Sequence, residues 1–482
     1  MKTLITLLAL VPTLCFGQWT QLGNHIEGTQ SSGRLGKSVS IDGTGQNISV
    51  GLPNKANSNG DNTGQVQVYE LQGATWALKG NSISGNNRGD NFGDDIKLSD
   101  NGNVVAIGAP GFTTSPTTNG FAAVYEYNGS NWIQRGLDLI GSSTDDSYGT
   151  AVSLSSDGSI VAVAAEPFVR ASYIRVFQWN GTSWNQLGSD ISTGMPGDGF
   201  GRWINLDSNG TTLAASAVNH DSPLSDIGRA MVFEWNGSNW VQKGSDLIGD
   251  GEDDFFGAGV ALNGDGNTLV VGARDDVFNM SRGYVKIFDW NGTSWIQKGS
   301  NLIGAQGGDF FGDVNDINSS GDIIVSGTVL GNYAKIHQFQ GTDWVELDSI
   351  SVTGGIQFGT AVSMNNSGSQ VIIGDFSNLV GNLNAAGRAT VFENNTILSM
   401  QNLGDLVNIS IFPNPASHFI RVESEQNIKA YRISSIEGKL IQNETTFNQH
   451  NFNIDIHGLR NGIYVLELIS DKDKKSMKLI KE

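Results

Sequence analysis

The pattern that decides the fold lies in residues 148–188, which read YGTAVSLSSDGSIVAVAAEPFVRASYIRVFQWNGTSWNQLG. Apolar and polar residues alternate there in short runs, and Asp-Gly or Asn-Gly pairs separate the runs. Alternation with a period of two predicts strands, and Asn-Gly supplies the positive φ angles of a tight hairpin turn. The stretch therefore predicts four antiparallel strands, at 151–154, at 160–164, at 174–179 and from Trp184 onward.

Two markers of this unit recur in phase along the chain. The first is a Trp four residues before a Gly, and the second is an apolar or aromatic residue followed by Gly. The first marker occurs at Trp19, Trp76, Trp132, Trp184, Trp240 and Trp295, with a version that lacks the Gly at Trp344. The second marker occurs at Leu35, Phe92, Tyr148, Phe200, Phe256, Phe311 and Phe358. Because both markers occur seven times at a similar spacing, we predict seven repeats.

The repeats are expected to stack, because a sheet of four short strands cannot bury both of its faces alone. Radial stacking gives a seven-bladed β-propeller, and an open solenoid is the alternative. The chain ends favour the propeller. The array begins with an extra fourth strand at 19–23 and ends with a third strand at 389–393 that has no fourth strand after it. We therefore expect the segment near Trp19 to pair with the segment near Val391 and to close a ring.

The repeat also resembles a known family. In the second and fifth units, the Phe-Gly marker is followed by Ile-Gly-Ala-Pro at 107–110 and by Val-Gly-Ala at 271–273. In this respect residues 18–395 resemble the FG-GAP repeat of integrin-α-type propellers. The resemblance implies an extracellular ligand-binding and adhesion scaffold, often with calcium in an Asp-rich loop. The nearest match to that loop, at 263–267, offers only one carboxylate, so we expect no cofactor and leave calcium as the open alternative.

A second module follows the repeats, and we expect a linker at 396–408 between the two. Residues 409–482 contain six alternating runs that predict a small, immunoglobulin-like β-sandwich. The predicted strands lie at 409–412, 419–422, 430–433, 453–456, 463–468 and 476–480.

Ordered motifs in this module resemble a second family. They are Phe-Pro-Asn-Pro-Ala at 412–416, Gly-Lys at 438–439, Gly-Leu-Arg-Asn-Gly-Ile-Tyr at 458–464 and Lys-Leu-Ile-Lys at 478–481. Together they resemble the C-terminal sorting domain of the type IX, or Por, secretion system of Bacteroidetes, although Arg460 stands where that family often has Pro. The resemblance implies that residues 409–482 are recognised by the type IX machinery at the outer membrane. It also implies that they are usually removed, and that the cargo is released or attached to the cell surface.

The amino terminus predicts export as well. Residues 1–17 combine a positive charge at Lys2 with an apolar run that is too short to span a bilayer. We therefore predict a signal peptide cleaved between Gly17 and Gln18, and no transmembrane anchor. Lipidation at Cys15 is the alternative. Cys15 is the only cysteine, so the mature chain would have no disulfide and no cysteine metal site.

Charge and motifs limit the function classes. The chain has 29 Lys and Arg against 48 Asp and Glu, a net charge of −19, which excludes a general affinity for nucleic acid. Neither His-Glu-x-x-His nor Gly-x-Ser-x-Gly occurs. We therefore expect a protein that binds an extracellular glycan or protein, with no assigned catalytic residue. A polysaccharide hydrolase or lyase that uses the propeller face is the alternative, and a structural spacer is a third interpretation.

Carboxylates cluster just before the second marker in several units. They are Asp90, Asp145, Asp146, Asp198, Asp253, Asp254 and Asp309. If equivalent loops converge on one rim, these residues form an acidic, cation-attracting ring. The alternative, which we favour, is that they form turns and solvated charges. Trp179 and Trp235, beside the Asn-Gly turns, are candidates for sugar stacking, and packing between blades is the favoured alternative.

Overall fold

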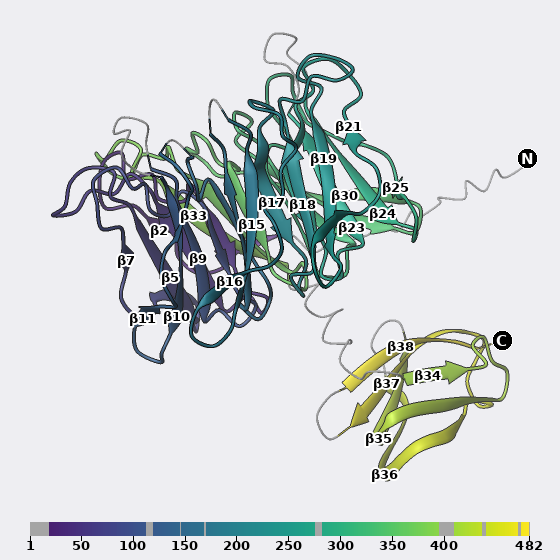
Figure 1. The fold of residues 1–482 in the computed structure, drawn as a ribbon. Helices are drawn as coiled ribbons and strands as arrows, with labels where there is room; N and C mark the ends of the chain where they lie inside the picture. Colours follow the sequence, from purple (N-terminus) through teal and green to yellow (C-terminus); the bar gives the residue numbers. More distant parts are fainter. Residues whose placement is uncertain are drawn as a thin grey trace, which may run out of the picture. The chain divides into compact units, whose positions relative to one another are not determined.

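The computed structural model describes residues 19–111, 119–144, 146–167, 170–274, 282–394, 409–435, 440–470 and 474–481. Within these ranges the chain forms strands, turns and loops (Figure 1). It divides into two compact units, Met1–Asn394 and Asn395–Glu482, which are described separately. The predicted signal peptide at 1–17, its cleavage site at Gly17 and Gln18, and the predicted linker at 396–408 lie outside the described residues. No helix in the described ranges is long and apolar enough to cross a membrane.

The first unit contains seven antiparallel sheets, which are the blades of a propeller, so the predicted all-β fold with seven blades is confirmed. Blade 1 has β3 (Val39–Ile41), β4 (Asn47–Leu52), β5 (Gln65–Gln72), β6 (Thr75–Leu78) and β7 (Ile83–Ser84). Blade 2 has β8 (Ile96–Leu98), β9 (Val104–Ala109), β10 (Phe121–Tyr127), β11 (Trp132–Gln134) and β12 (Leu139–Ile140). Blade 3 has β13 (Ala151–Leu154), β14 (Ile160–Ala165), β15 (Tyr173–Trp179) and β16 (Trp184–Gln186).

The remaining four blades repeat this order, from the innermost strand outward. Blade 4 has β17 (Phe200–Leu206), β18 (Thr212–Ala217), β19 (Arg229–Trp235), β20 (Trp240–Gln242) and β21 (Leu247–Ile248). Blade 5 has β22 (Phe256–Leu262), β23 (Thr268–Ala273), β24 (Tyr284–Trp290), β25 (Trp295–Gln297) and β26 (Leu302–Ile303). Blade 6 has β27 (Asn315–Ile317), β28 (Ile323–Gly327), β29 (Ala334–Gln340) and β30 (Asp343–Ile350). Blade 7 has β31 (Ala361–Met364), β32 (Gln370–Asp375), β33 (Arg388–Glu393), β1 (Thr20–Gln21) and β2 (Ile26–Glu27).

The two ends of the repeat array meet in blade 7, as predicted. Gln21 on β1 lies opposite Phe392 on β33, and the Leu22 N–H donates to the Val391 carbonyl at 2.9 Å. Chain segments separated by the whole array therefore share one sheet, and the propeller is a closed ring.

A ring of backbone hydrogen bonds joins the turns between the first two strands of all seven blades. Each turn donates one N–H to a carbonyl in the turn of a neighbouring blade, at 2.8 to 3.1 Å. The seven donors, which we call the turn ring, are Gly43, Asp100, Ser156, Ser208, Gly264, Ser319 and Asn366. Asn366 donates to Gly43 and closes the circle. Since every member is both donor and acceptor, the ring is complete only with all seven blades.

The second marker supplies the cores, which lie between adjacent blades. The seven marker side chains are at most 1 % exposed. Phe92, for example, packs with Val66 and Val68 of blade 1 and with Ile107 of blade 2. Burying such side chains contributes about 1.5 to 3 kcal/mol each relative to leaving them exposed, so the marker joins blades as well as filling them.

The first marker also joins neighbouring blades. In six blades the Trp indole donates to a carbonyl of the preceding blade at 2.7 to 3.2 Å, as Trp295 does to Lys243 at 2.8 Å. The accepting residue directly precedes the marker Gly. Gly244 has φ 84°, and a Cβ atom there would lie 2.9 Å from the rings of Trp290 and Trp295. The marker therefore requires Gly both for its backbone angle and for its contact with the next indole.

The marker Gly also interrupts the outer strand. In blades 1, 2, 4, 5 and 7 the outer strand resumes after the Gly as a short segment that pairs again with the third strand. In blade 6 Asp348 stands in place of the Gly, and β30 runs unbroken. Asp348 accepts the Trp19 backbone N–H at 3.2 Å, whereas the Trp19 indole N–H has no partner among the described residues. The closing blade is therefore held by a different bond from the other six.

The second unit is a small all-β domain. It contains β34 (Ile409–Phe412), β35 (Phe419–Ser435), β36 (Leu440–Asp455), β37 (Gly462–Ser470) and β38 (Lys474–Lys481). The predicted strands at 419–422 and 430–433 are wrong as separate elements, because β35 runs through both. Its first part pairs with β34 and its later part with β37, with register shifts between Glu423 and Ala430. The strands enclose one apolar core.

Gly244→Ala is expected to lower the free energy of unfolding by about 2 to 4 kcal/mol, since the methyl group meets the indoles and the backbone angle is strained. Gly292→Ala is the matched control, because Gly292 also has a positive φ, of 98°, but nothing lies within 4 Å of the added Cβ. We expect that control to cost about 1 to 2 kcal/mol. Denaturant titration of both variants measures the difference, and equal costs would contradict the role of the Trp contact.

Deletion of residues 18–24 removes β1 and the buried Trp19, so the edge of β33 loses its partner. We expect the midpoint of thermal unfolding to fall by at least about 5 °C. Gln21→Ala, which changes an exposed side chain and leaves the backbone pairing intact, is the control. An unchanged midpoint in the deletion variant would show that ring closure does not stabilise the propeller.

Candidate functional site

The candidate acidic rim residues that the structure describes lie in the loops before the inner strands of blades 2 to 6. Five of them are buried: Asp90, Asp146, Asp198, Asp254 and Asp309. Asp253 is half-buried with φ 62°, and Asp145 lies outside the described residues. None of the five lines the central cavity described below. Among the described residues, no three His, Cys, Asp or Glu side chains are placed to hold a metal ion. The expectation of no cofactor, with calcium as the open alternative, stays a prediction.

Local hydrogen bonds account for the burial of these carboxylates. Asp254 accepts the backbone N–H groups of Asp250 and Gly251 at 2.7 and 2.8 Å. It also accepts the Tyr284 hydroxyl at 2.6 Å, and burial together with this carboxylate raises the pKa of Tyr284 well above its ordinary value. Lys286 lies over the Tyr284 ring. The same arrangement of an Asp carboxylate, a Tyr hydroxyl and a cationic side chain occurs in blades 3 and 6. In each of these blades the carboxylate therefore connects the loop before the inner strand to the start of the third strand.

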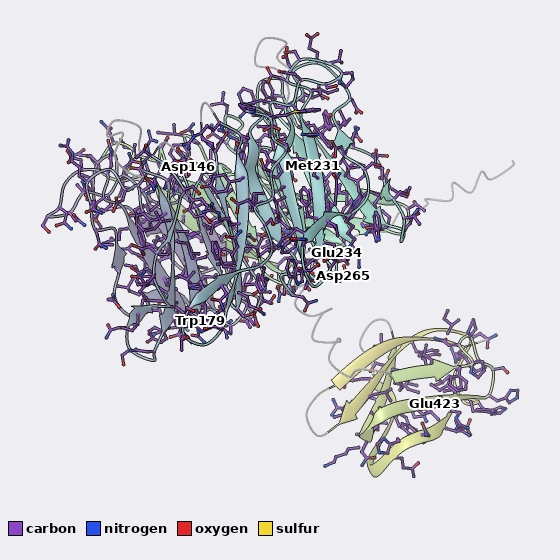
Figure 2. All side chains as sticks on the ribbon, viewed as in Figure 1. Asp146, Trp179, Met231, Glu234, Asp265 and Glu423 are labelled. Atoms are coloured by element: carbon purple, nitrogen blue, oxygen red, sulfur yellow. The ribbon has the colours of Figure 1, made fainter. Side chains whose placement is uncertain are left out.

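The Trp residues beside the Asn-Gly turns pack against neighbouring aromatic rings. The Trp179 and Trp184 ring centres are 5.2 Å apart, and the Arg135 guanidinium lies over Trp179 at 5.0 Å. Trp235 packs against Trp240 in the same way, at 5.7 Å. Figure 2 shows Trp179 at the opposite edge of the propeller from Asp146. These rings therefore belong to the contacts between blades, and both are half-buried.

A cavity of about 330 Å³ lies at the centre of the propeller, and we call it the well. All seven inner strands and the residues just before them line it. A second cavity of about 60 Å³ continues toward the turn ring, whose seven members line it. The central channel is therefore wide on the side of the long loops and narrow at the turn ring.

Side chains in the well link the inner strands of adjacent blades. The residue four positions after the Gly of the second marker accepts a backbone N–H from the next blade in five cases, at 2.8 to 3.3 Å. These acceptors are Ser40, Ser153, Asn205, Asp316 and Ser363. The equivalent residues in blades 2 and 5 are Lys97 and Ala261, neither of which can accept such a bond. Asn315 links blades 5 and 6 instead, by donating to the Gly259 carbonyl at 2.7 Å.

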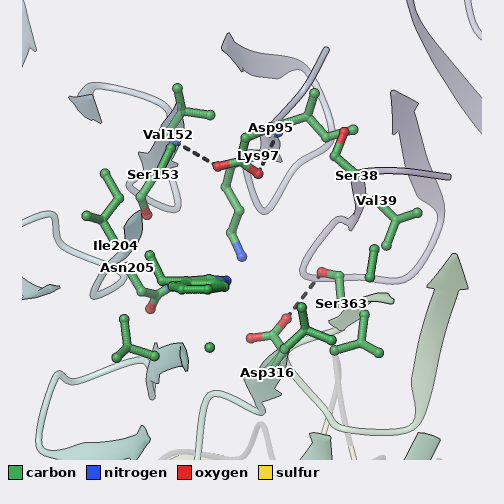
Figure 3. Close-up of a pocket in the computed structure, with 18 of the residues that line it drawn as sticks. Ser38, Val39, Asp95, Lys97, Val152, Ser153, Ile204, Asn205, Asp316 and Ser363 are labelled. Atoms are coloured by element: carbon green, nitrogen blue, oxygen red, sulfur yellow. Dashed lines mark hydrogen bonds between the residues drawn. The ribbon is translucent and has the colours of Figure 1, made fainter. Parts of the chain in front are cut away.

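Asp95 replaces the missing acceptor in blade 2. Its carboxylate accepts the Val152 N–H at 2.8 Å and the Ile96 N–H at 2.9 Å (Figure 3). Removal from bulk water raises the pKa of Asp95 to about 6, and the two N–H groups only partly oppose this shift. Two residues along the strand, the half-buried Lys97 points into the well. Lys97 forms no hydrogen bond or ion pair with any described residue.

Two of the other charged groups around the well, Arg202 and Asp316, are partly compensated, whereas the Lys37 and Asp94 side chains form no hydrogen bond or ion pair with a described residue. Arg202 lies 3.5 Å from Glu166 and packs over the Trp203 ring at 5.1 Å. Asp316 accepts the Ser363 hydroxyl and the Met364 N–H. The well thus combines acceptor oxygens, one aromatic ring and two ammonium groups, those of Lys37 and Lys97, that have no hydrogen-bond or ion-pair partner among the described residues.

Sequence reasoning missed the well, although a signal was present. If the seven repeats are aligned on the Gly of the second marker, the fourth following residue is Ser, Lys, Ser, Asn, Ala, Asp and Ser in chain order. Five of these seven residues accept hydrogen bonds readily, the exceptions are Lys97 and Ala261, and Lys97 is the only one of the seven with a positive charge. The deviation from the repeat, and not the repeat itself, identifies the site.

Comparisons with known proteins give one family match. The family model described as the secretion system C-terminal sorting domain matches residues 410–482. A comparison with curated proteins gives no match. The predicted sorting domain is therefore confirmed, and the chain is exported through the type IX secretion system to the cell surface or the medium. The FG-GAP repeat type stays a prediction.

Two solved structures resemble this chain at low sequence identity. Hydrazine synthase of Kuenenia stuttgartiensis is 11 % identical over 77 % of this chain and 98 % of its own, with a TM-score of 0.52. A putative 6-phosphogluconolactonase of Bacteroides fragilis is 13 % identical over 71 % of this chain and 97 % of its own, with a TM-score of 0.48. At this identity the likeness concerns the fold alone.

Asp95→Asn is expected to change how stability depends on pH. The unfolded chain ionises this carboxyl near 3.8, whereas the folded chain keeps the proton up to about pH 6. Asp95 therefore stabilises the fold fully at low pH, and this contribution of roughly 1 to 3 kcal/mol is lost as the pH rises from about 4 to 6. The variant should lack that loss, apart from a constant cost for its altered hydrogen bonds. Asp265→Asn, in an exposed turn, is the control, and identical pH profiles for all three proteins would contradict the assignment.

Proposed function

We propose that the mature chain is an exported binding protein whose propeller takes up an extracellular ligand, a glycan or a protein group, through the well. The observation that carries the proposal is the unpartnered ammonium group of Lys97 among acceptor oxygens in a cavity of about 330 Å³. Cavities of about this size and larger commonly hold small ligands. The adhesion role implied by the FG-GAP resemblance belongs to this proposal.

The shape of the channel supports entry from the side of the long loops. On the opposite side, the space next to the turn ring is about 60 Å³, which is enough for a few water molecules. A ligand in the well would therefore contact inner strands from several blades at once, and the rigid ring would hold these contacts in place.

A hydrolase or lyase acting on polysaccharide is the second candidate. Two carboxylates, Asp95 and Asp316, line the same cavity, and the pKa of Asp95 is raised to about 6, as for a group that donates a proton near neutral pH. Both carboxylates, however, already accept backbone N–H groups that link blades. This structural use favours binding over catalysis.

Binding without turnover is the expected result when the full-length protein is applied to a glycan array and then incubated with each bound glycan. Reducing ends should not accumulate over hours. Accumulating reducing ends that are absent with Asp95→Asn would support the hydrolase instead. No binding to any glycan, and none to extracellular matrix or cell-surface proteins on a parallel array, would contradict the proposal.

A further inference from the structure

We propose that Lys97 anchors the single carboxylate of a small polyhydroxylated ligand, that is, an acidic sugar of the uronate type, held in the well. This inference rests on the proposed binding function and names the ligand class. It follows from the position of Lys97 in the repeat, from the groups that surround it and from the size of the cavity.

The position of Lys97 is the first step. At the equivalent place, Ser40, Ser153 and Ser363 each accept a backbone N–H of the next blade. A Ser at 97 would make the same kind of bond to blade 3, and Asp95, two residues earlier and just before β8, makes the link to blade 3 instead. The lysine therefore replaces a residue that would serve the fold, and its ammonium group extends into the well (Figure 3). A side chain of this kind is explained by a ligand better than by packing.

The charges around Lys97 disfavour a ligand with more than one negative charge. Three cations, Lys37, Lys97 and Arg202, line the well together with four carboxylates, those of Asp94, Asp95, Glu166 and Asp316. Arg202 is paired with Glu166, so it offers little free positive charge. Asp95 and Asp316 line the same cavity and would repel a phosphate dianion. A carboxylate monoanion that pairs with Lys97 meets less of this repulsion than a dianion does. Lysine donates three hydrogen bonds and accepts none, which suits a carboxylate oxygen.

The remaining lining suits hydroxyl groups and a sugar ring. Asn205, Ser153 and Ser363 place amide and hydroxyl groups in the well, and carboxylate oxygens accept hydroxyl hydrogens. Trp203 adds an aromatic ring to the wall. A volume of about 330 Å³ is enough for roughly one or two sugar rings. Together these features point to a mono- or disaccharide unit that carries one carboxylate.

Lys97→Ser separates this role from folding, because the new residue is the one that three other blades carry. We expect isothermal titration calorimetry of the full-length protein to show binding of D-glucuronate or D-galacturonate at least tenfold tighter than binding of D-glucose or D-galactose. Lys97→Ser should lose at least tenfold in uronate affinity and keep or raise the midpoint of thermal unfolding. Lys97→Arg should retain affinity within about threefold, since it keeps the charge. Lys55→Ser, at a half-buried lysine of blade 1 that does not line the well, is the control.

Three outcomes would overturn the inference. One is equal affinity for uronates and neutral sugars, and another is full uronate affinity in Lys97→Ser. The third is tighter binding of inorganic phosphate than of uronate. If an array ligand binds with equal affinity to Lys97→Ser and to the unmodified protein, the inference fails and the binding function stands. If no array ligand and no sugar binds, both fail.

Discussion

The contact between a Trp of one blade and a Gly of the preceding blade is the interaction on which the propeller depends. The indole reaches a backbone carbonyl of the neighbouring blade only because the Gly has no side chain in its path, as at Trp295 and Gly244. The same Gly bends the outer strand and divides it. One pair of residues therefore sets the distance between blades, the shape of each blade edge and the spacing that is visible in the sequence.

Blade 6 lacks the marker Gly and shows what changes without it. Asp348 replaces the Gly, the outer strand continues without a break, and the next indole, that of Trp19, finds no hydrogen-bond partner among the described residues. The carboxylate of Asp348 instead accepts the Trp19 backbone N–H. Between blades 6 and 7, a hydrogen bond from a backbone N–H to a carboxylate therefore stands where the other blades have the indole hydrogen bond.

Much of the fold was predictable from the sequence, because the Trp-Gly and Phe-Gly markers repeat and a repeated pattern reports on backbone geometry. The site was not predictable, because its lining residues come from all seven repeats. The informative residues are those that differ from the repeated pattern. Lys97 has no neighbours in sequence that reveal its environment. Conversely, the carboxylates near the second marker attracted attention as charges, but the Tyr284 hydroxyl that holds Asp254 lies 30 residues further along the chain.

The pairing of β1 with β33 has a consequence for the order in which the molecule forms. The segment at Thr20–Gln21 leaves the ribosome among the first residues of the repeat array, but its partner at Arg388–Glu393 is synthesised last. Until β33 is present, the opening strand has no sheet to join, and any blades already assembled keep an unprotected edge. Ring closure is therefore a late step of folding. A chain truncated before β33 would expose unpaired strand edges that can pair with other chains.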